Sequence, residues 1–395
     1  MHGAVGISSM KLLYISQGNI PSKWAHTFQA MKMADALAGE VDDLTLLTSG
    51  GLLHEGGESP DCADWYGTGD RFSIVRLPIF WKLEGPFITW WKSLRFDRVA
   101  ALYARCASPD MVYTRSAYAG RLCINLGLKT VIELHMGGEH SELHHIVSVA
   151  HNPRLLGVVT ISPALPRRYV QSGIPEEKIL VWPDAVDVDA FDRLPEKMAL
   201  RKQLNLAQEA PVATYCGHLY RNRGIEEILQ CARQLPSVSF LLIGGWDEDI
   251  ERIKPEAATL GNVCCAGFIP NSRVPAYLKA SDVLLMPYPA TCDTAEWMSP
   301  LKLFEYMAAG RAIVATDLPA LRVHLIHGRN AHLVPPGDAD GMAGAIRSII
   351  ADGEYARNLG LAARRDVAAY TWNNRARAIV GRFCNPAATA ERALA

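Results

Sequence analysis

The sequence lacks several features that would assign it to a common functional class. Its nine cysteines form no C-x-x-C pair, which argues against a zinc site or a disulfide framework and favours a reducing cytoplasm. No run of about 18 apolar residues occurs, so no transmembrane helix is expected. The opening MHGAVGISSM also lacks the charged and apolar regions of a signal peptide. Lysine and arginine total 40 against 41 acidic residues, which argues against a broad nucleic-acid-binding surface.

Several motifs of phosphate and metal chemistry are absent as well. Without a G-x-G-x-x-G turn the chain is a poor candidate for a dinucleotide cofactor, and without a Walker motif it is a poor candidate for NTP hydrolysis. The histidine-rich stretch 140–151 contains no H-E-x-x-H zinc pattern. No carboxylate pair is recognisable as the acid and nucleophile of a glycosidase.

Short apolar segments alternate with amphipathic ones along the whole chain, which predicts parallel sheets covered on both faces. One series of predicted strands covers 12–16, 43–49, 111–115, 130–135 and 157–162, and a second covers 211–217, 239–245, 262–268, 282–288, 312–316 and 331–336. The polar, helical stretch 193–205 separates the two series. We therefore predict an α/β protein of two doubly wound domains that meet near residue 190.

Ligands of such sheets bind beyond the carboxyl ends of the strands. GHLYRNRG (217–224) follows a predicted strand and carries Arg221 and Arg223 between glycines. Glycine lets the backbone approach a ligand, and the guanidinium fork suits phosphate oxygens. The alternative is a solvated turn with two surface arginines.

SPLKLFEYMAAG (299–310) predicts a helix with Ser299 as its N-cap and Pro300 at its first position. Lys302 then opposes the helix dipole, and a diphosphate bound to the unpaired N–H groups would explain it. Glu305 shares its face and would accept hydrogen bonds from sugar hydroxyls. The alternative is an i,i+3 salt bridge between Lys302 and Glu305.

The N-terminal half holds two further candidate segments. His135 ends a predicted strand and is followed by two glycines, which favours a ligand-facing imidazole over a structural one. The loop 16–27 carries Gly18, Asn19, Ser22, Lys23 and His26, which could touch donor or acceptor, or form an ordinary surface loop.

The segment 78–96, PIFWKLEGPFITWWKSLRF, is rich in aromatic and cationic residues. Three interpretations stay open for it: an acceptor-binding flap, a patch that contacts a membrane surface, and an ordinary helix with its aromatic side chains packed inward.

Together these motifs resemble the large retaining glycosyltransferase family called group 1 (family 4), of the GT-B fold. The resemblance is carried by GHLYRNRG (217–224), SPLKLFEYMAAG (299–310) and LVPPGD (333–338), and more loosely by ELH (133–135) and PDAVD (183–187). It implies two Rossmann-like domains facing a cleft: residues 1–190 on the acceptor side, completed by a C-terminal helix in 371–395, and residues 191–370, which bind a nucleotide-diphospho-sugar. It implies a hexosyltransferase-like reaction without an essential metal or cofactor, on a glycan, lipid-linked or small-molecule acceptor.

The resemblance also assigns residue roles. It implies His135, Arg223 and Glu305 as the catalytic set. The implied donor-binding residues are Gly18, Gly217, His218, Arg223, Glu296, Ser299, Pro300, Leu301, Lys302 and Glu305. The implied acceptor-side residues are Asn19, Lys23 and His26.

Two positions depart from the family pattern. The first glutamate of the family's E-x7-E motif falls at Trp297, with Glu296 one place away, and the arginine expected before the basic residue falls at His218. We assign the donor-sugar contact to Glu296 or to the backbone near Ser299. Two rival functions stay open: a nucleotide-sugar epimerase of the same fold, and a non-catalytic subunit that binds a sugar nucleotide.

Overall fold

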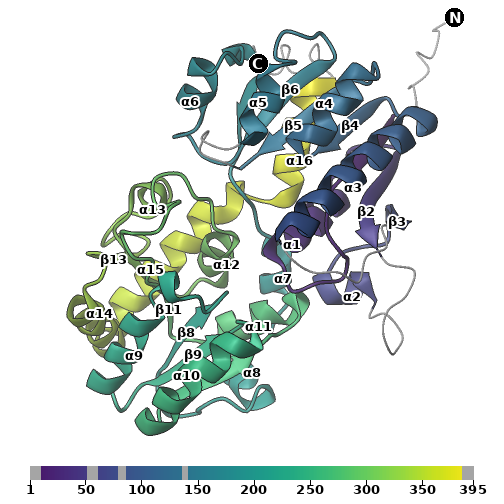
Figure 1. The fold of residues 1–395 in the computed structure, drawn as a ribbon. Coiled ribbons are helices and arrows are strands. Elements are labelled where there is room, and N and C mark those ends of the chain that lie inside the picture. Colours follow the sequence, from purple (N-terminus) through teal and green to yellow (C-terminus); the bar gives the residue numbers. More distant parts are fainter. Residues whose placement is uncertain (1–9, 51–60, 79–85, 136–140, 385–395) are drawn as a thin grey trace, which may run out of the picture. The chain divides into compact units, whose positions relative to one another are not determined.

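The computed structural model describes residues 10–50, 61–78, 86–135 and 141–384, without the side chains of 86–94 and 141. The chain divides into two compact units. Met1–Pro183 with Trp372–Ala395 is the N-terminal unit, and Asp184–Thr371 is the C-terminal unit. Each is built around one parallel sheet with helices packed on it (Figure 1). The predicted α/β class with two doubly wound sheets is confirmed.

Seven parallel strands form the sheet of the N-terminal unit, in the order β3-β2-β1-β4-β5-β6-β7. The strands are β1 (Lys11–Ile15), β2 (Asp43–Gly50), β3 (Ser73–Pro78), β4 (Met111–Thr114), β5 (Thr130–Leu134), β6 (Leu155–Thr160) and β7 (Ile179–Val181). The helices are α1 (Ala25–Leu37), α2 (Cys62–Tyr66), α3 (Pro86–Ala107), α4 (Ala117–Asn125), α5 (Ser141–Val147), α6 (Pro166–Gln171) and α16 (Trp372–Cys384). Strand order reverses between β1 and β4, which is where a ligand site is expected.

Six parallel strands form the sheet of the C-terminal unit, in the order β10-β9-β8-β11-β12-β13. They are β8 (Val212–Cys216), β9 (Ser239–Ile243), β10 (Val263–Gly267), β11 (Val283–Met286), β12 (Ala312–Thr316) and β13 (His332–Val334). The helices are α7 (Val188–Asp192), α8 (Lys197–Gln203), α9 (Ile225–Gln234), α10 (Asp247–Leu260), α11 (Val274–Ala280), α12 (Leu301–Ala309), α13 (Pro319–Arg322), α14 (Ala339–Ala351) and α15 (Gly353–Asp366). Here the order reverses between β8 and β11.

The C-terminal sheet separates two apolar cores. Successive side chains of a strand point to opposite faces, so Leu285 of β11 packs into the core that includes residues of α9 and α14, whereas Leu284 packs with α11 and α12. Both leucines are fully buried. A strand covered on both faces must be apolar throughout, which is why these strands were recognisable in the sequence.

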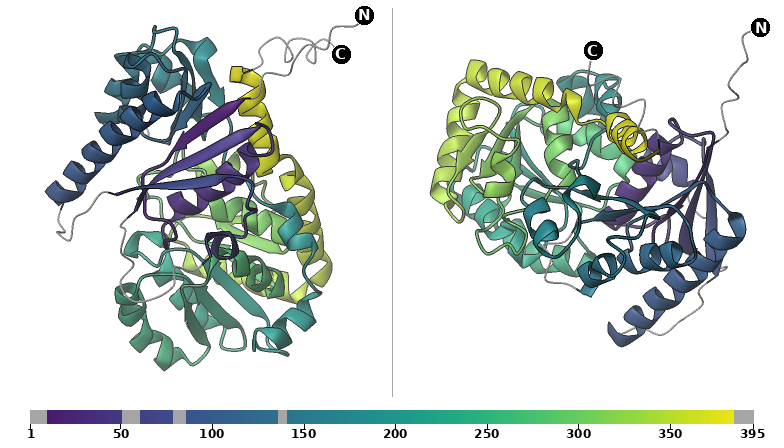
Figure 2. Two further views of the ribbon diagram at one scale, coloured as in Figure 1. Left: turned by 90° about the vertical axis from the view of Figure 1, so that its right-hand side faces the viewer. Right: turned by 90° about the horizontal axis from the view of Figure 1, so that it is seen from above.

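The last helix of the chain belongs to the N-terminal unit. α16 packs against α1 and β6 (Figure 2). Its Arg375 is fully buried and pairs with the buried Glu133 of β5 through two contacts of 3.1 Å. Arg375 Nε also donates to the carbonyl of Pro183 at 3.0 Å. A guanidinium is tolerated in a core only when it is paired in this way.

No helix in the described parts of the chain combines the length and the apolar character needed to cross a membrane.

We expect Arg375→Met to destabilise the N-terminal unit by about 3–5 kcal/mol, because it leaves the Glu133 carboxylate buried without its charged partner. Faster hydrogen–deuterium exchange of the β5 and α16 amides would report the loss of stability.

The matched control is Arg377→Met on the same helix, whose exposed pair with Glu40 spans 3.4 Å. It should change stability by less than about 1 kcal/mol. Equal effects of the two variants would contradict the assigned role of Arg375.

Candidate functional site

Glycines bring three strand ends of the C-terminal unit into close contact. A Cβ on Gly224 would lie 1.7 Å from the Pro287 carbonyl oxygen, and one on Gly244 would lie 2.5 Å from the Gly217 carbonyl oxygen. Gly217 has φ +143°, and a Cβ there would lie 2.5 Å from Lys302 Nζ. The Lys302 side chain therefore lies across the bare backbone at the end of β8.

Lys302 is held among aromatic rings. Its Nζ lies 4.0 Å from the centroid of the Tyr215 ring and 5.3 Å from that of Tyr288. Such cation–π contacts partly replace the water that burial removes. Burial and the nearby positive charge of Arg223 together lower the Lys302 pKa to about 7, although Cys216 and Glu305 act in the opposite direction. A bound anion at this point would favour the charged form of Lys302.

Arg223 approaches the same rings from the loop after β8. Its guanidinium carbon lies 5.5 Å from the centroid of the Tyr288 ring, and its Nη1 donates to Cys292 Sγ at 3.4 Å. Arg221, two residues earlier, is exposed. From the sequence alone, both arginines were candidates for binding phosphate. In the structure only Arg223 lies against the Tyr288 ring, beside Lys302.

His218 lies in the same neighbourhood. Its ring stacks on Tyr220 at 4.9 Å and on Trp246 at 5.9 Å. Burial lowers its pKa, and the positive charges of Lys302 and Arg223 lower it further. His218 is therefore neutral near pH 7, which leaves the positive charge of this cluster to Arg223 and Lys302.

The start of α12 differs from the prediction. Pro300, with ψ of 127°, is the N-cap, and the helix has no side-chain cap. Ser299 was predicted as that cap, and this was wrong: its Oγ accepts a hydrogen bond from the Asp184 N–H at 2.9 Å. The extended backbone at Pro300 delays the helix, so Leu301 and Lys302 open it. Glu296 is exposed in the turn before it.

A pocket of about 510 Å³ lies in the N-terminal unit, where strand order reverses between β1 and β4. Gly18, Asn19 and His26 line it, together with Trp24, and the exposed Lys23 does not. Trp24, which is 48% exposed, is the one large apolar side chain among its eleven lining residues. The pocket is thus suited to a polar ligand with one flat apolar face.

Gly18 lies close to the His26 ring at the edge of this pocket, where a side chain would not fit. Its φ is +143°, and a Cβ there would lie 2.8 Å from His26 Nε2. The Gly18 N–H donates to Ser49 Oγ at 3.1 Å. Burial lowers the His26 pKa to about 4, and the charge of Arg115 lowers it further, so this imidazole is neutral near pH 7.

His135 follows β5 and is held from both ring nitrogens. Arg115 Nη2 lies 3.2 Å from Nδ1, and Nε2 contacts Glu133 Oε1 closely. Arg115 also lines the pocket, so it connects His135 to the predicted acceptor loop. Neither Arg115 nor Glu133 was predicted as a site residue. Arg115 could have been found, because it ends a predicted strand, as His135 does.

Residues 210–352 match the family model of group 1 glycosyl transferases. This span carries the cluster around Gly217 and lies entirely in the C-terminal unit. The chain is therefore similar to group 1 glycosyl transferases in the part of its C-terminal unit that holds this cluster.

Curated relatives match this chain over part of its length. The chain is 27% identical to a phosphatidyl-myo-inositol mannosyltransferase of Mycolicibacterium smegmatis over 229 residues, 56% of this chain and 55% of that protein. It is 28% identical to a 2-deoxystreptamine glucosyltransferase of Streptomyces kanamyceticus over 187 residues, 44% and 46% of the two chains. The matches thus span about half the length of these relatives.

Solved structures match nearly the whole chain in fold. Sucrose-phosphate synthase from Thermosynechococcus elongatus gives a TM-score of 0.75 at 19% identity, covering 96% of this chain and 100% of that one. Anabaena Alr3699/HepE in complex with UDP-glucose gives 0.72 at 18% identity, covering 94% and 99%. The predicted GT-B fold is confirmed.

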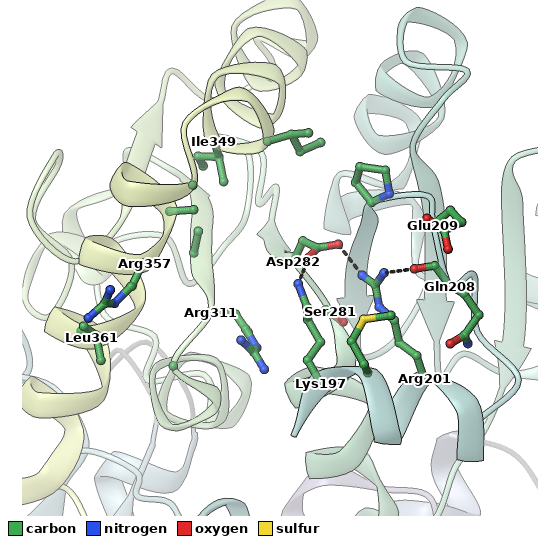
Figure 3. A pocket seen from close by; sticks show the side chains of 17 residues that line it. Lys197, Arg201, Gln208, Glu209, Ser281, Asp282, Arg311, Ile349, Arg357 and Leu361 are labelled. Carbon is green, nitrogen blue, oxygen red and sulfur yellow. Dashed lines mark hydrogen bonds and ion pairs between the residues drawn. The ribbon is translucent and has the colours of Figure 1, made fainter. Parts of the chain in front are cut away.

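Another pocket, of about 630 Å³, lies in the C-terminal unit at the amino-terminal ends of β8, β11 and β12, opposite the Lys302 cluster (Figure 3). None of its lining residues was predicted as a site residue. Two cations of this pocket, Lys197 and Arg201, form ion pairs with Asp282, and Lys197 Nζ lies 2.6 Å from Asp282 Oδ1. Arg201 Nη1 also donates to the Gln208 carbonyl at 3.4 Å. These cations hold α8 to the sheet, so we assign this pocket a structural origin.

The prediction for 78–96 falls mainly outside the described residues. The helix α3 covers its second half, but the side chains of 79–94 are outside the description, so none of its three interpretations is tested.

We expect Lys302→Met to raise the melting temperature at low pH. Because the Lys302 pKa falls from 10.5 to about 7 on folding, the unfolded chain binds the proton more tightly between these values. The loss of folding stability caused by burying the charged Lys302 is therefore largest below about pH 7, and it decreases as the pH rises toward 10.5. A gain of at least about 2 °C near pH 6 that shrinks near pH 9 is the expected result.

The control for this pH series is Lys254→Met on α10, an exposed lysine paired with Glu251. Its effect on the melting temperature should not vary over the same range. A Lys302→Met effect that is equally independent of pH would show that burial does not penalise the ammonium.

Proposed function

We propose that the chain is a retaining glycosyltransferase that moves a sugar from a nucleotide-diphospho-sugar to an acceptor hydroxyl, in glycan, polysaccharide or glycoconjugate biosynthesis. The observation that carries this proposal is the convergence of Arg223 and Lys302 on the Tyr288 ring at the β8–β11 reversal, with Lys302 against Gly217. The group 1 family match and the glycosyltransferase relatives support it. The reaction consumes the donor as substrate, and we propose no essential metal or cofactor.

In this proposal the C-terminal unit binds the donor. Arg223 and Lys302 bind the diphosphate beside Gly217 and His218, with the first N–H groups of α12 as further donors. Glu305, nearly one turn beyond Lys302, accepts hydrogen bonds from the ribose hydroxyls. The donor sugar is contacted by Glu296 or by the backbone at Ser299–Leu301.

The chemistry then depends on electrostatic stabilisation of the leaving group. The bond from the anomeric carbon to the diphosphate oxygen breaks, and negative charge grows on the departing nucleoside diphosphate. Arg223 and the recharged Lys302 stabilise that charge without metal assistance. The acceptor hydroxyl forms the new bond on the same face, and its proton passes to an oxygen of the departing diphosphate. His135 completes the catalytic set, as the family resemblance implies.

The N-terminal pocket is the proposed acceptor site. Its polar lining, with Asn19 and His26, offers hydrogen-bond partners to hydroxyl groups, and Trp24 offers a ring face to the apolar side of a sugar. An acyl or prenyl chain would find little apolar surface there. We therefore favour the sugar part of a glycan or of a lipid-linked glycan as the occupant of this pocket, and leave Lys23 as a contact at its exterior.

Cellular location is part of the same proposal. All nine cysteines are free thiols, which suits a reducing cytoplasm. We propose peripheral contact with the inner membrane face through 78–96, and co-sedimentation with anionic vesicles tests it.

Arg223→Ala should abolish donor binding, and Arg221→Ala should not, because only Arg223 turns toward Tyr288 and Lys302. The measurement is a thermal-shift screen of UDP-, GDP-, ADP- and TDP-sugars, starting with UDP-glucose, the ligand of one structural relative. A ligand at 100 times its Kd stabilises the wild type by about 2.7 kcal/mol. A wild type that responds to none of them would refute the donor site.

The two rival functions are separated by product analysis. A transferase releases nucleoside diphosphate when acceptor is added and forms a product whose anomeric configuration matches the donor's. An epimerase would change the sugar nucleotide without an acceptor. A non-catalytic subunit would bind donor with no turnover, and an activity lost in Arg223→Ala would exclude it.

A further inference from the structure

The N-terminal unit holds a buried polar network around Glu133, of which the proposed function uses only His135. Glu133 lies on β5 and its side chain is fully buried. Its Oε1 accepts from Gln29 Nε2 at 2.7 Å, and its Oε2 accepts the hydroxyl hydrogen of Tyr113 closely. With Arg375 and His135, four side chains converge on one carboxylate.

The charges in this network are fixed by those partners. Burial alone would raise the Glu133 pKa, but the charges of Arg375 and Arg115 and the hydrogen bond from His135 hold it well below the ordinary value. A carboxylate that is ionised can only accept hydrogen bonds. The His135 nitrogen that contacts Glu133, Nε2, must therefore carry the hydrogen.

The other ring nitrogen is fixed just as firmly. A guanidinium has donors and no acceptor, so Arg115 Nη2 donates to His135 Nδ1 across 3.2 Å. Arg115 is itself held: its Nη1 donates to Gln29 Oε1 at 2.7 Å and to the His26 carbonyl at 3.2 Å. A proton added to Nδ1 would face this guanidinium directly and would break its hydrogen bond.

We propose that Arg115 and Glu133 are positioning residues that fix His135 as one neutral tautomer, with hydrogen on Nε2 and none on Nδ1. His135 then gives and takes no proton during the reaction. It contributes a rigid dipole whose orientation is set by Arg115 on one side and Glu133 on the other. Only this catalytic consequence rests on the proposed function, because the tautomer exists in the free protein.

The network also connects the parts of the N-terminal unit. Arg115 lines the acceptor pocket, Gln29 comes from α1, and Arg375 comes from α16. An acceptor that displaces Arg115 would release His135 Nδ1, so occupation of the pocket and the state of His135 are coupled through one side chain.

Heteronuclear NMR of the full chain with ¹⁵N-labelled histidine, near pH 7 and without ligand, tests the proposal. The His135 signals are assigned as those missing from His135→Gln. The expected pattern is a neutral ring protonated at Nε2. In Arg115→Met the pattern should change to a mixture of tautomers or to a protonated ring. Arg98→Met, an exposed arginine on α3, should leave it as in the wild type.

A wild-type His135 that is protonated on Nδ1 or on both nitrogens would overturn the proposal. So would an Arg115→Met spectrum in which the His135 signals are unchanged. Arg115 is only half-buried, so its replacement leaves the core pair of Glu133 and Arg375 intact, and folding is checked on the same spectra.

Turnover supplies the second readout. Arg115→Met should lower kcat by roughly 10- to 100-fold, as expected when a reacting group is misplaced by about an ångström, while donor KM changes less than about threefold. Equal kcat for Arg115→Met and Arg98→Met would overturn the catalytic consequence. A chain that shows the expected tautomer but no transfer with any donor would instead refute the proposed function and leave the tautomer assignment standing.

Discussion

The N-terminal unit depends on one buried ion pair, between Glu133 on its central sheet and Arg375 on the last helix of the chain. Two charges in an apolar core are unfavourable unless every donor and acceptor has a partner. That requirement places α16 beside α1, orders Gln29 and Tyr113, and leaves one Glu133 oxygen for His135. The position of a predicted site residue thus follows from how a core carboxylate is neutralised.

The C-terminal unit meets a different constraint, which is the close approach of backbone at the β8–β11 reversal. Gly217, Gly224 and Gly244 lie where any side chain would collide with a neighbouring strand end or with Lys302. This packing leaves Lys302 above Tyr215, dehydrated and with a lowered pKa. A buried lysine whose charged form is disfavoured costs stability, and such a cost is typical of binding sites.

Much of this was predictable from the sequence because it depends on local patterns. The buried strands of both sheets are largely apolar, and eleven of the thirteen strands in the described residues overlap a predicted strand. β3 and β7 were missed because they lie at the two edges of their sheet, where Leu77 of β3 is the one buried residue. Gly217, Arg223 and Lys302 were found because each lies just beyond a strand or at a helix start. Glu133, Tyr215 and Tyr288 were not predicted as site residues. Each lies within or beside an apolar strand, and the neighbouring sequence does not indicate which distant side chain it will contact. The Ser299 cap failed because the backbone at Pro300 is extended, and that depends on the hydrogen bond from distant Asp184.

The sharing of α16 has a consequence for how the chain is made. During synthesis the first 183 residues leave the ribosome long before Arg375 does, so Glu133 has no guanidinium partner while the C-terminal unit is being translated. The core of the C-terminal unit includes Val367, which is made shortly before Arg375, so neither unit has all of its core residues until the end of the described chain has been synthesised. The unit that begins the sequence therefore waits through the translation of the whole second unit before its central carboxylate can be neutralised.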